Sequence, residues 1–139
     1  MAISNYLQKH LAEALLRGTE FTMPDTLALC FLKATPNPSD DGSFAGGNEV
    51  ANSFNYGRIE IGPGTDKWTA YSTGHITNSE EYEVTCDGGD WGIIVAYGVT
   101  DSTDYAGGNL LFYTTITAQT ITDGDTFTIG VGSLNFSLF

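Results

Sequence analysis

Acidic side chains are the first candidates for chemistry, because aspartates gather in pairs at four points of the chain. A hard cation such as Ca²⁺ takes roughly six to eight oxygen ligands from carboxylates and carbonyls on a flexible loop. None of the pairs has the spacing of an EF-hand loop, and Asp is itself favoured in turns. We therefore expect solvated turn residues and no metal ion at the four pairs, which are Asp40 with Asp41, Asp87 with Asp90, Asp101 with Asp104, and Asp123 with Asp125.

Other side chains that could catalyse a reaction do not form a recognisable set. Glu80, Glu81 and Glu83 could supply two carboxylates for glycoside hydrolysis, but that chemistry needs the two groups on opposite sides of a cleft. Three glutamates this close together predict a solvated strand edge that discourages edge pairing. His10 lies on the apolar side of a predicted helix, and His75 lies in a run rich in Thr and Ser, without a fixed partner. We expect no enzymatic activity and no cofactor.

The two cysteines, Cys30 and Cys86, each lie inside an apolar or strand-like run. Two cysteines in such places resemble neither a disulfide framework nor a zinc site, so we expect two buried free thiols.

Aromatic rings could form a contact patch for a carbohydrate or a protein, since amphipathic rings dominate such patches. In a small β-domain half or more of them will belong to the core. A cytoplasmic carbohydrate-binding β-sandwich is therefore one alternative, and its candidate residues are Trp68, Tyr71, Tyr97, Tyr105 and Tyr113.

The charge balance disfavours two classes of partner. The chain has 5 basic and 17 acidic side chains, a net charge of −12, and every Lys and Arg lies at or before Lys67. Such a surface repels the phosphates of nucleic acid and the head groups of anionic lipid. No long apolar window predicts a membrane span, and the N-terminus does not resemble a signal peptide. We expect synthesis in a cytoplasm, with neither nucleic acid nor membrane as a partner.

The 139 residues predict a single domain, 1–139, with one helix over about residues 5–17 and a β-domain over about 26–139. Ser4 is a suitable N-cap and Gly18 a suitable C-terminal stop. A helix of this length is marginal alone, so its apolar stripe must pack on the sheet or on another subunit. The residues we predict at an interface with another subunit or a partner protein are Tyr6, Leu7, His10, Leu11, Leu15 and Phe44.

The remaining pattern predicts strands separated by turns. Residues 26–33 are apolar on both faces and predict a central strand, and residues 35–47 predict a loop. Residues 93–99 and 110–116 predict a buried hairpin with its turn at 101–109, whose core we expect to include Trp91, Ile94, Tyr97, Leu111 and Phe112. Shorter strands are predicted at 56–61, 75–78, 81–86, 126–131 and 134–139. The fold class is mainly β, an antiparallel β-sandwich or barrel-like domain with one N-terminal α-helix.

Several short motifs, in their order along the chain, resemble small virion proteins of tailed bacteriophages, a family often labelled tail-fibre-like. The resemblance spans nearly the whole sequence. It rests on Leu16-Arg17-Gly18-Thr19, Asn48-Glu49-Val50, Tyr56-Gly57-Arg58, Asn78, Asp90-Trp91-Gly92, the run from Gly107 to Tyr113, the run from Gly124 to Phe127, and Gly132-Ser133-Leu134.

The resemblance implies a structural protein of the virion without catalytic residues. Because the sequence contains no heptad repeat for a fibre shaft, we expect a head decoration or cement protein that binds the major capsid protein. A tail, collar or fibre-base component is the alternative. We also expect a homo-oligomer, with a trimer favoured.

Overall fold

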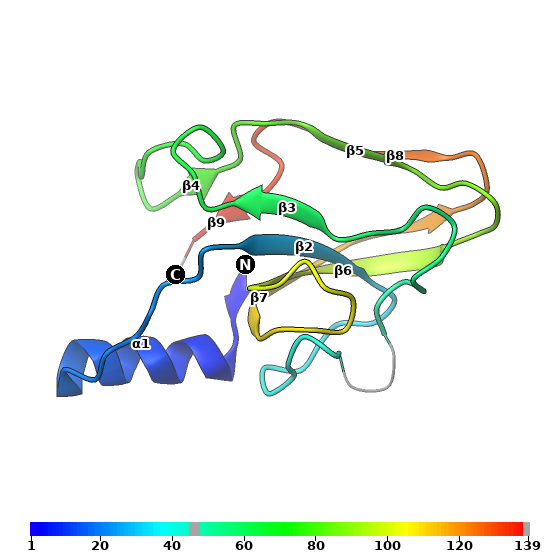
Figure 1. Cartoon of the computed structure of the whole chain (residues 1–139). Helices are drawn as coiled ribbons and strands as arrows, with labels where there is room; N and C mark the ends of the chain where they lie inside the picture. The colour runs from blue at the N-terminus through cyan, green and yellow to red at the C-terminus, as the bar shows by residue number, and fades with distance from the viewer. Residues whose placement is uncertain (45–47, 138–139) are drawn as a thin grey trace.

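A computed structural model describes residues 1–44 and 48–137 of the chain (Figure 1). The described residues contain one helix and nine strands. The helix is α1 (Asn5–Arg17), and the strands are β1 (Ala2–Ile3), β2 (Leu27–Leu32), β3 (Ile59–Gly62), β4 (Ile76–Thr77), β5 (Tyr82–Thr85), β6 (Gly92–Thr100), β7 (Leu110–Ile121), β8 (Thr126–Ile129) and β9 (Asn135–Phe136).

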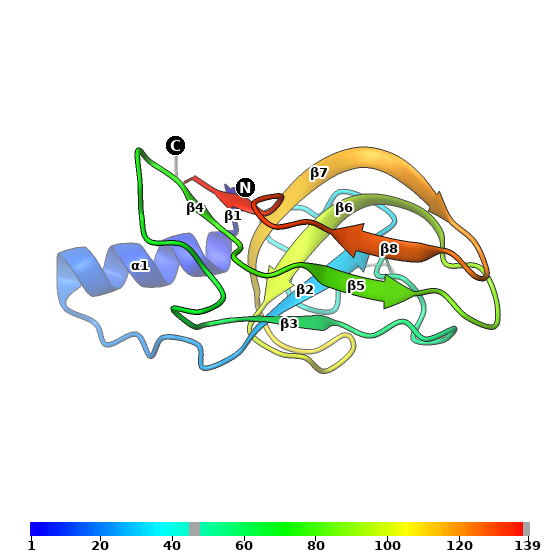
Figure 2. The ribbon, with the colours of Figure 1, turned by 90° about the horizontal axis from the view of Figure 1, so that it is seen from above.

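The strands form one large sheet and two small ones. The large sheet has the order β1-β7-β6-β2-β3, and β5 with β8 and β4 with β9 form two-stranded sheets. Every pairing is antiparallel. Figures 1 and 2 show the β5–β8 ribbon lying across one face of the large sheet. The predicted fold class, mainly antiparallel β with one N-terminal helix, is confirmed.

The main core fills the space between the large sheet and the β5–β8 ribbon. Phe31 of β2 lies at its centre, with its ring 4.9 Å from that of Phe127 on β8 and 5.9 Å from that of Trp91. β2 is hydrogen-bonded to β6 on one side and to β3 on the other, and its residues from Ala28 to Leu32 are all buried. The predicted burial of this strand on both faces is confirmed.

The hairpin of β6 and β7 is longer than its apolar residues predict. β7 continues to Ile121, five residues beyond the predicted end at Ile116. Its second half, from Thr114 to Thr120, is rich in Thr and largely exposed, so no apolar alternation marks it as a strand. β1 pairs only with Phe112 and Tyr113, and among the described residues no strand pairs with the outer edge of β7 beyond them.

The helix begins and ends where the sequence predicts. The Ser4 side chain accepts a hydrogen bond from the Leu7 amide (3.1 Å) and donates one to the Leu110 carbonyl (2.6 Å), which ties the start of α1 to β7. Gly18 ends the helix in the left-handed region, with φ of 68°. β1, which precedes the helix, was not predicted because two residues carry no periodic signal.

Three other predicted elements differ from the structure or lie partly outside it. The strand predicted at 56–61 begins only at Ile59, because Phe54 and Asn55 adopt positive φ in a turn just before it. β8 ends at Ile129, and β9 covers only Asn135 and Phe136 of the last predicted strand. Residues 45–47 of the predicted loop and 138–139 of that last strand lie outside the described residues.

Two further expectations can be compared with the structure. Cys30 and Cys86 are buried free thiols, as predicted. In the described part of the chain, no helix has both the length and the apolar character needed to cross a membrane.

The hairpin core yields a first prediction. Trp91 is 5% exposed, and its indole nitrogen donates a hydrogen bond to the Phe54 carbonyl (2.9 Å). Trp91→Ala leaves a cavity against Phe31, so we expect the free energy of unfolding to fall by about 3 to 5 kcal/mol in urea titrations. The matched control is Ile93→Ala, two residues along and 54% exposed, which should change it by only about 0.5 kcal/mol. Equal losses for the two variants would contradict this account of the core.

Candidate functional site

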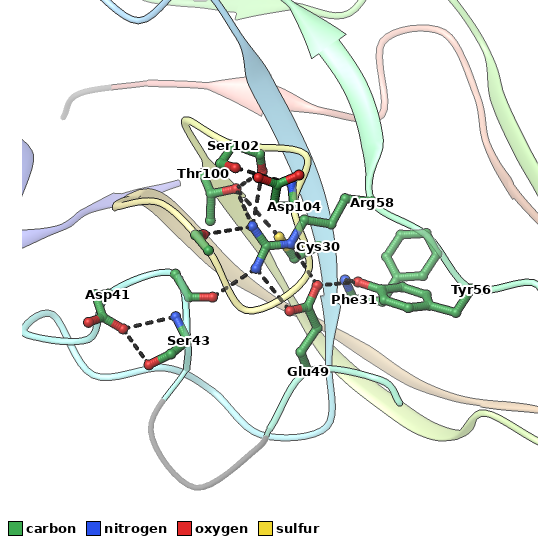
Figure 3. A network of polar contacts seen from close by, with 12 residues as sticks. Cys30, Phe31, Asp41, Ser43, Glu49, Tyr56, Arg58, Thr100, Ser102 and Asp104 are labelled. Carbon is green, nitrogen blue, oxygen red and sulfur yellow. Dashed lines mark hydrogen bonds and ion pairs between the residues drawn. The ribbon is translucent and has the colours of Figure 1, made fainter. Parts of the chain in front are cut away.

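A buried ion pair between Glu49 and Arg58 organises one end of the molecule (Figure 3). The guanidinium and the carboxylate meet through two hydrogen bonds, Nε to Oε1 at 2.8 Å and Nη2 to Oε2 at 2.9 Å. Their side chains are 0% and 2% exposed. This paired arrangement is the strongest geometry available to an arginine and a carboxylate.

The remaining donors of Arg58 hold loops together. Nη2 donates to the Gly42 carbonyl at 2.7 Å, and Nη1 donates to the carbonyls of Ser102 and Gly107 at 3.0 and 2.9 Å. The loop before Phe44 and the turn of the β6–β7 hairpin are therefore bound to the same guanidinium. The two backbones approach so closely that a Cβ on Gly42 would overlap the Gly107 carbonyl, which explains the glycine there.

Tyr56 and Cys30 join this network to β2. The Tyr56 hydroxyl donates to Glu49 Oε1 (2.7 Å) and accepts from the Phe31 amide (3.2 Å), while Cys30 Sγ lies 3.8 Å from the Thr100 hydroxyl. Burial raises the pKa of the Cys30 thiol to about 12, although the charge of Arg58 opposes this. Burial also raises the pKa of Tyr56, with the neighbouring Cys30 and Glu49 adding to the effect.

Arg58 stays charged in this setting. Burial on its own would lower the pKa of Arg58, but the hydrogen bonds and charge of Glu49 outweigh it, so the pKa rises. The polar atoms of the pair are occupied by partners within the chain. The arrangement positions loops and leaves no free acid, base or nucleophile in it.

Several members of the acidic pairs bind backbone amides within turns or between neighbouring loops. Asp101 accepts from the Asn109 amide at 2.6 Å, and the Asp123 carboxylate accepts from the Gly88 amide at 2.9 Å. The hydrogen bond from the Ser43 side chain lowers the pKa of Asp41. Across residues 1–44 and 48–137, no three His, Cys, Asp or Glu side chains are placed to share a metal ion.

An apolar arm is the exposed feature best suited to contact a partner. We define the arm as residues 5–24, which comprise α1 and the segment that returns from it. Figure 1 shows the helix leading away from the sheets toward its C-terminal end. Along the same stripe, Leu7 is 7% exposed where the helix meets β7, whereas Leu15 is 83% exposed. Leu16 and Met23 are exposed to 81% and 64%.

A groove with apolar walls lies along the arm, and the exposed Met23 is one of the side chains that line it. It has a volume of about 440 Å³, and its walls include Leu7, Leu11, Phe21, Met23, Pro24 and Phe112. His10 fills the space between two aromatic rings of the arm, 4.4 Å from the ring of Tyr6 and 5.1 Å from that of Phe21. The return segment therefore packs on the helix.

A second hollow of about 370 Å³ lies across Leu27 and Phe112 from the groove, and its walls include Trp68, Ile76 and Phe136. The indole nitrogen of Trp68 already donates to the Ile61 carbonyl (2.6 Å), so it is not offered to a ligand. Only Thr65 and Thr69 supply side-chain hydroxyls to the walls. The hollow suits an apolar partner better than a sugar, which needs several polar contacts.

The structure separates the six residues predicted for an interface into two groups. Leu7 and Phe44 are 7% and 1% exposed, so their side chains are covered by their own chain. Phe44 packs in a second core cluster with Leu32 and Leu110 and lies beneath Arg58, 5.9 Å from ring centre to guanidinium carbon. An interface role for the other four, Tyr6, His10, Leu11 and Leu15, stays a prediction.

Sequence reasoning missed Leu16 and Met23 as exposed members of the arm, and it missed the Glu49–Arg58 pair. Leu16 lies off the predicted stripe, and Met23 lies outside the predicted helix. A signal for the pair was present, since Arg58 is one of only two cations after Lys33 and lies between a tyrosine and a strand. Nothing in the spacing named Glu49 as its partner among 17 acidic residues.

Comparison with known protein families shows which family the chain belongs to. Residues 2–137 match the family described as podophage GP4 fiber I protein gp80. The chain belongs to this family. Membership confirms the predicted resemblance to structural, fibre-like proteins of tailed-phage virions, and it associates the chain with the virion. No curated protein matches the chain.

The buried pair yields a second prediction. Arg58→Met leaves the Glu49 carboxylate buried without its partner, so we expect a loss of about 3 to 5 kcal/mol in the free energy of unfolding. Combining it with Glu49→Leu should cost less than the sum of the two single changes, because neither charge is then left alone. The control is Lys67→Met in the solvent-accessible pair Lys67–Glu80 (3.2 Å), where solvent screens the charges and we expect little change in stability. If the losses in the free energy of unfolding from Glu49→Leu and Arg58→Met simply added in the double variant, that result would contradict an energetic coupling between the two side chains.

A third prediction concerns alkaline pH. The folded chain holds the protons of Cys30, Tyr56 and Tyr97 more tightly than the unfolded chain, because burial raises all three pKa values. This stability is complete below the unfolded pKa of the thiol, 9.0, and is lost as the pH rises toward the folded value of about 12. Urea titrations above pH 9 should show the free energy of unfolding falling, and Cys30→Ala should make the fall shallower. A flat profile would show that these groups are not buried.

Proposed function

We propose that this chain is a non-catalytic structural subunit of the fibre apparatus of a podophage virion, located at the tail, the collar or the base of a fibre. The observation that carries the proposal is the match of residues 2–137 to a family named for a podophage fibre protein. The match includes both the arm and the β-domain, so it supports a role for the whole described fold.

The dimensions of the fold support a position at a fibre base over a role as a fibre shaft. The helix has 13 residues, which is about 20 Å at 1.5 Å per residue. The longest strand among the described residues, β7, has 12 residues. Elements of this size build a compact subunit that connects other components. The family name, with its reference to a fibre, is why we prefer this position to the head decoration role that the sequence first suggested.

The two kinds of surface on the chain suit such a subunit. The apolar arm can be covered by a neighbouring protein in the particle. The rest of the chain carries all of the net negative charge, which keeps exposed parts of a virion from adhering to one another. Candidate catalytic side chains have structural partners, as in the pairs His75–Asn135 and Lys67–Glu80, which supports a role without chemistry.

Locating the chain in purified virions tests the proposal. Gold-labelled antibodies against the folded chain should mark the tail end of the particle. Quantitative mass spectrometry should give only about a few tens of copies per particle, because tail and collar assemblies have low cyclic symmetry. Copies on the order of hundreds, with label over the whole head, would establish the decoration role in its place.

A further inference from the structure

We propose that the arm docks on the arm of a second copy of this chain, with Leu15 and Leu16 of one copy seated in the groove beside Phe21 and Met23 of the other. The inference goes beyond the proposed function and does not depend on it, because it concerns how copies meet and not where in the virion they lie.

The arm is only half covered by its own chain. Leu7 packs against the β-domain, yet Leu15 and Leu16, two turns further along, are 83% and 81% exposed. A 13-residue helix has little stability in water without packing along its apolar stripe. Exposed leucines on the same arm as an apolar groove mark a surface that a partner covers.

The arm carries both projecting apolar side chains and an apolar groove that could receive such side chains. Leu15 and Leu16 project into solvent near the end of α1, and the groove of about 440 Å³ lies further back along the arm, with walls from Leu11, Phe21 and Met23. When projecting apolar side chains and an apolar hollow lie on the same arm, two copies can each fill the hollow of the other.

The distribution of charge favours a second copy over other partners. Residues 1–33 carry three cations and three anions, whereas residues 34–139 carry two cations and fourteen anions, so the net charge of −12 belongs to the second part. A basic partner would be drawn to the acidic β-domain and not to the neutral arm. Two copies that meet arm to arm bring neutral surfaces together and keep their acidic domains apart.

Sedimentation velocity on the purified full chain tests this inference. We expect the parent protein to self-associate with a dissociation constant of about 10 μM or tighter, and to associate more tightly as salt screens the repulsion between acidic domains. The double variant Leu15→Gln, Leu16→Gln keeps the charge and the helix propensity and should weaken association at least about tenfold. The matched control, Val131→Gln, changes a side chain that is 65% exposed on the β-domain and should leave association unchanged.

A second measurement remains informative if the double variant unfolds. Cys30 and Cys86 are buried, so a Leu16→Cys variant presents one accessible thiol. A short bifunctional maleimide should link Leu16→Cys copies to Met23→Cys copies mixed with them, because docking brings these two positions together, and it should not link Leu16→Cys copies to Val131→Cys copies.

A parent protein that stays monomeric at about 100 μM at every salt concentration would overturn the proposal. So would a folded double variant that associates as well as the parent, or equal linking of Leu16→Cys copies to Met23→Cys and to Val131→Cys copies. These outcomes concern the free chain, so they can be distinguished from a failure to find the chain at the fibre end of the virion.

Discussion

The buried pair of Glu49 and Arg58 is the interaction on which the irregular part of this fold depends. The loop before Phe44 and the hairpin turn at 101–109 have little regular structure, and carbonyls of both accept hydrogen bonds from the same guanidinium. Removing two charges from water is costly, so the pair gives less stability than its short distances suggest. What it provides is position, because one planar group with fixed donors sets where several segments meet.

Much of the fold follows from local patterns that the sequence displays. The ends of α1, the apolar strand β2 and the β6–β7 hairpin each carry a periodic or capping signal, and each is present. The second half of β7 could not be predicted, because its residues are held by pairing with β6 and carry no apolar alternation of their own. β1 exists only through its two contacts with β7, a tertiary effect that no local pattern encodes.

The candidate site was predictable in outline and not in detail. The apolar stripe of α1 indicates a contact surface, but which leucines remain exposed depends on how far the β-domain reaches along the helix. Leu7 meets β7 at the point where Ser4 ties the helix to the strand, and Leu15 lies beyond it. The burial of Phe44 could not be predicted from the sequence. A lone aromatic residue in a polar loop gives no sign that Gly98, which lies opposite it, leaves room for its ring.

The outer edge of β7 makes this protein sensitive to acid in a particular way. From Leu110 to Ile121 the strand has no charged residue and no proline, the two devices that usually keep a sheet edge from recruiting another strand. At neutral pH the net charge of −12 holds the edges of separate molecules apart. That repulsion vanishes near the isoelectric point of about 4.1. The edge of β7 is therefore best protected at neutral pH, and this electrostatic protection weakens as the pH falls toward the isoelectric point.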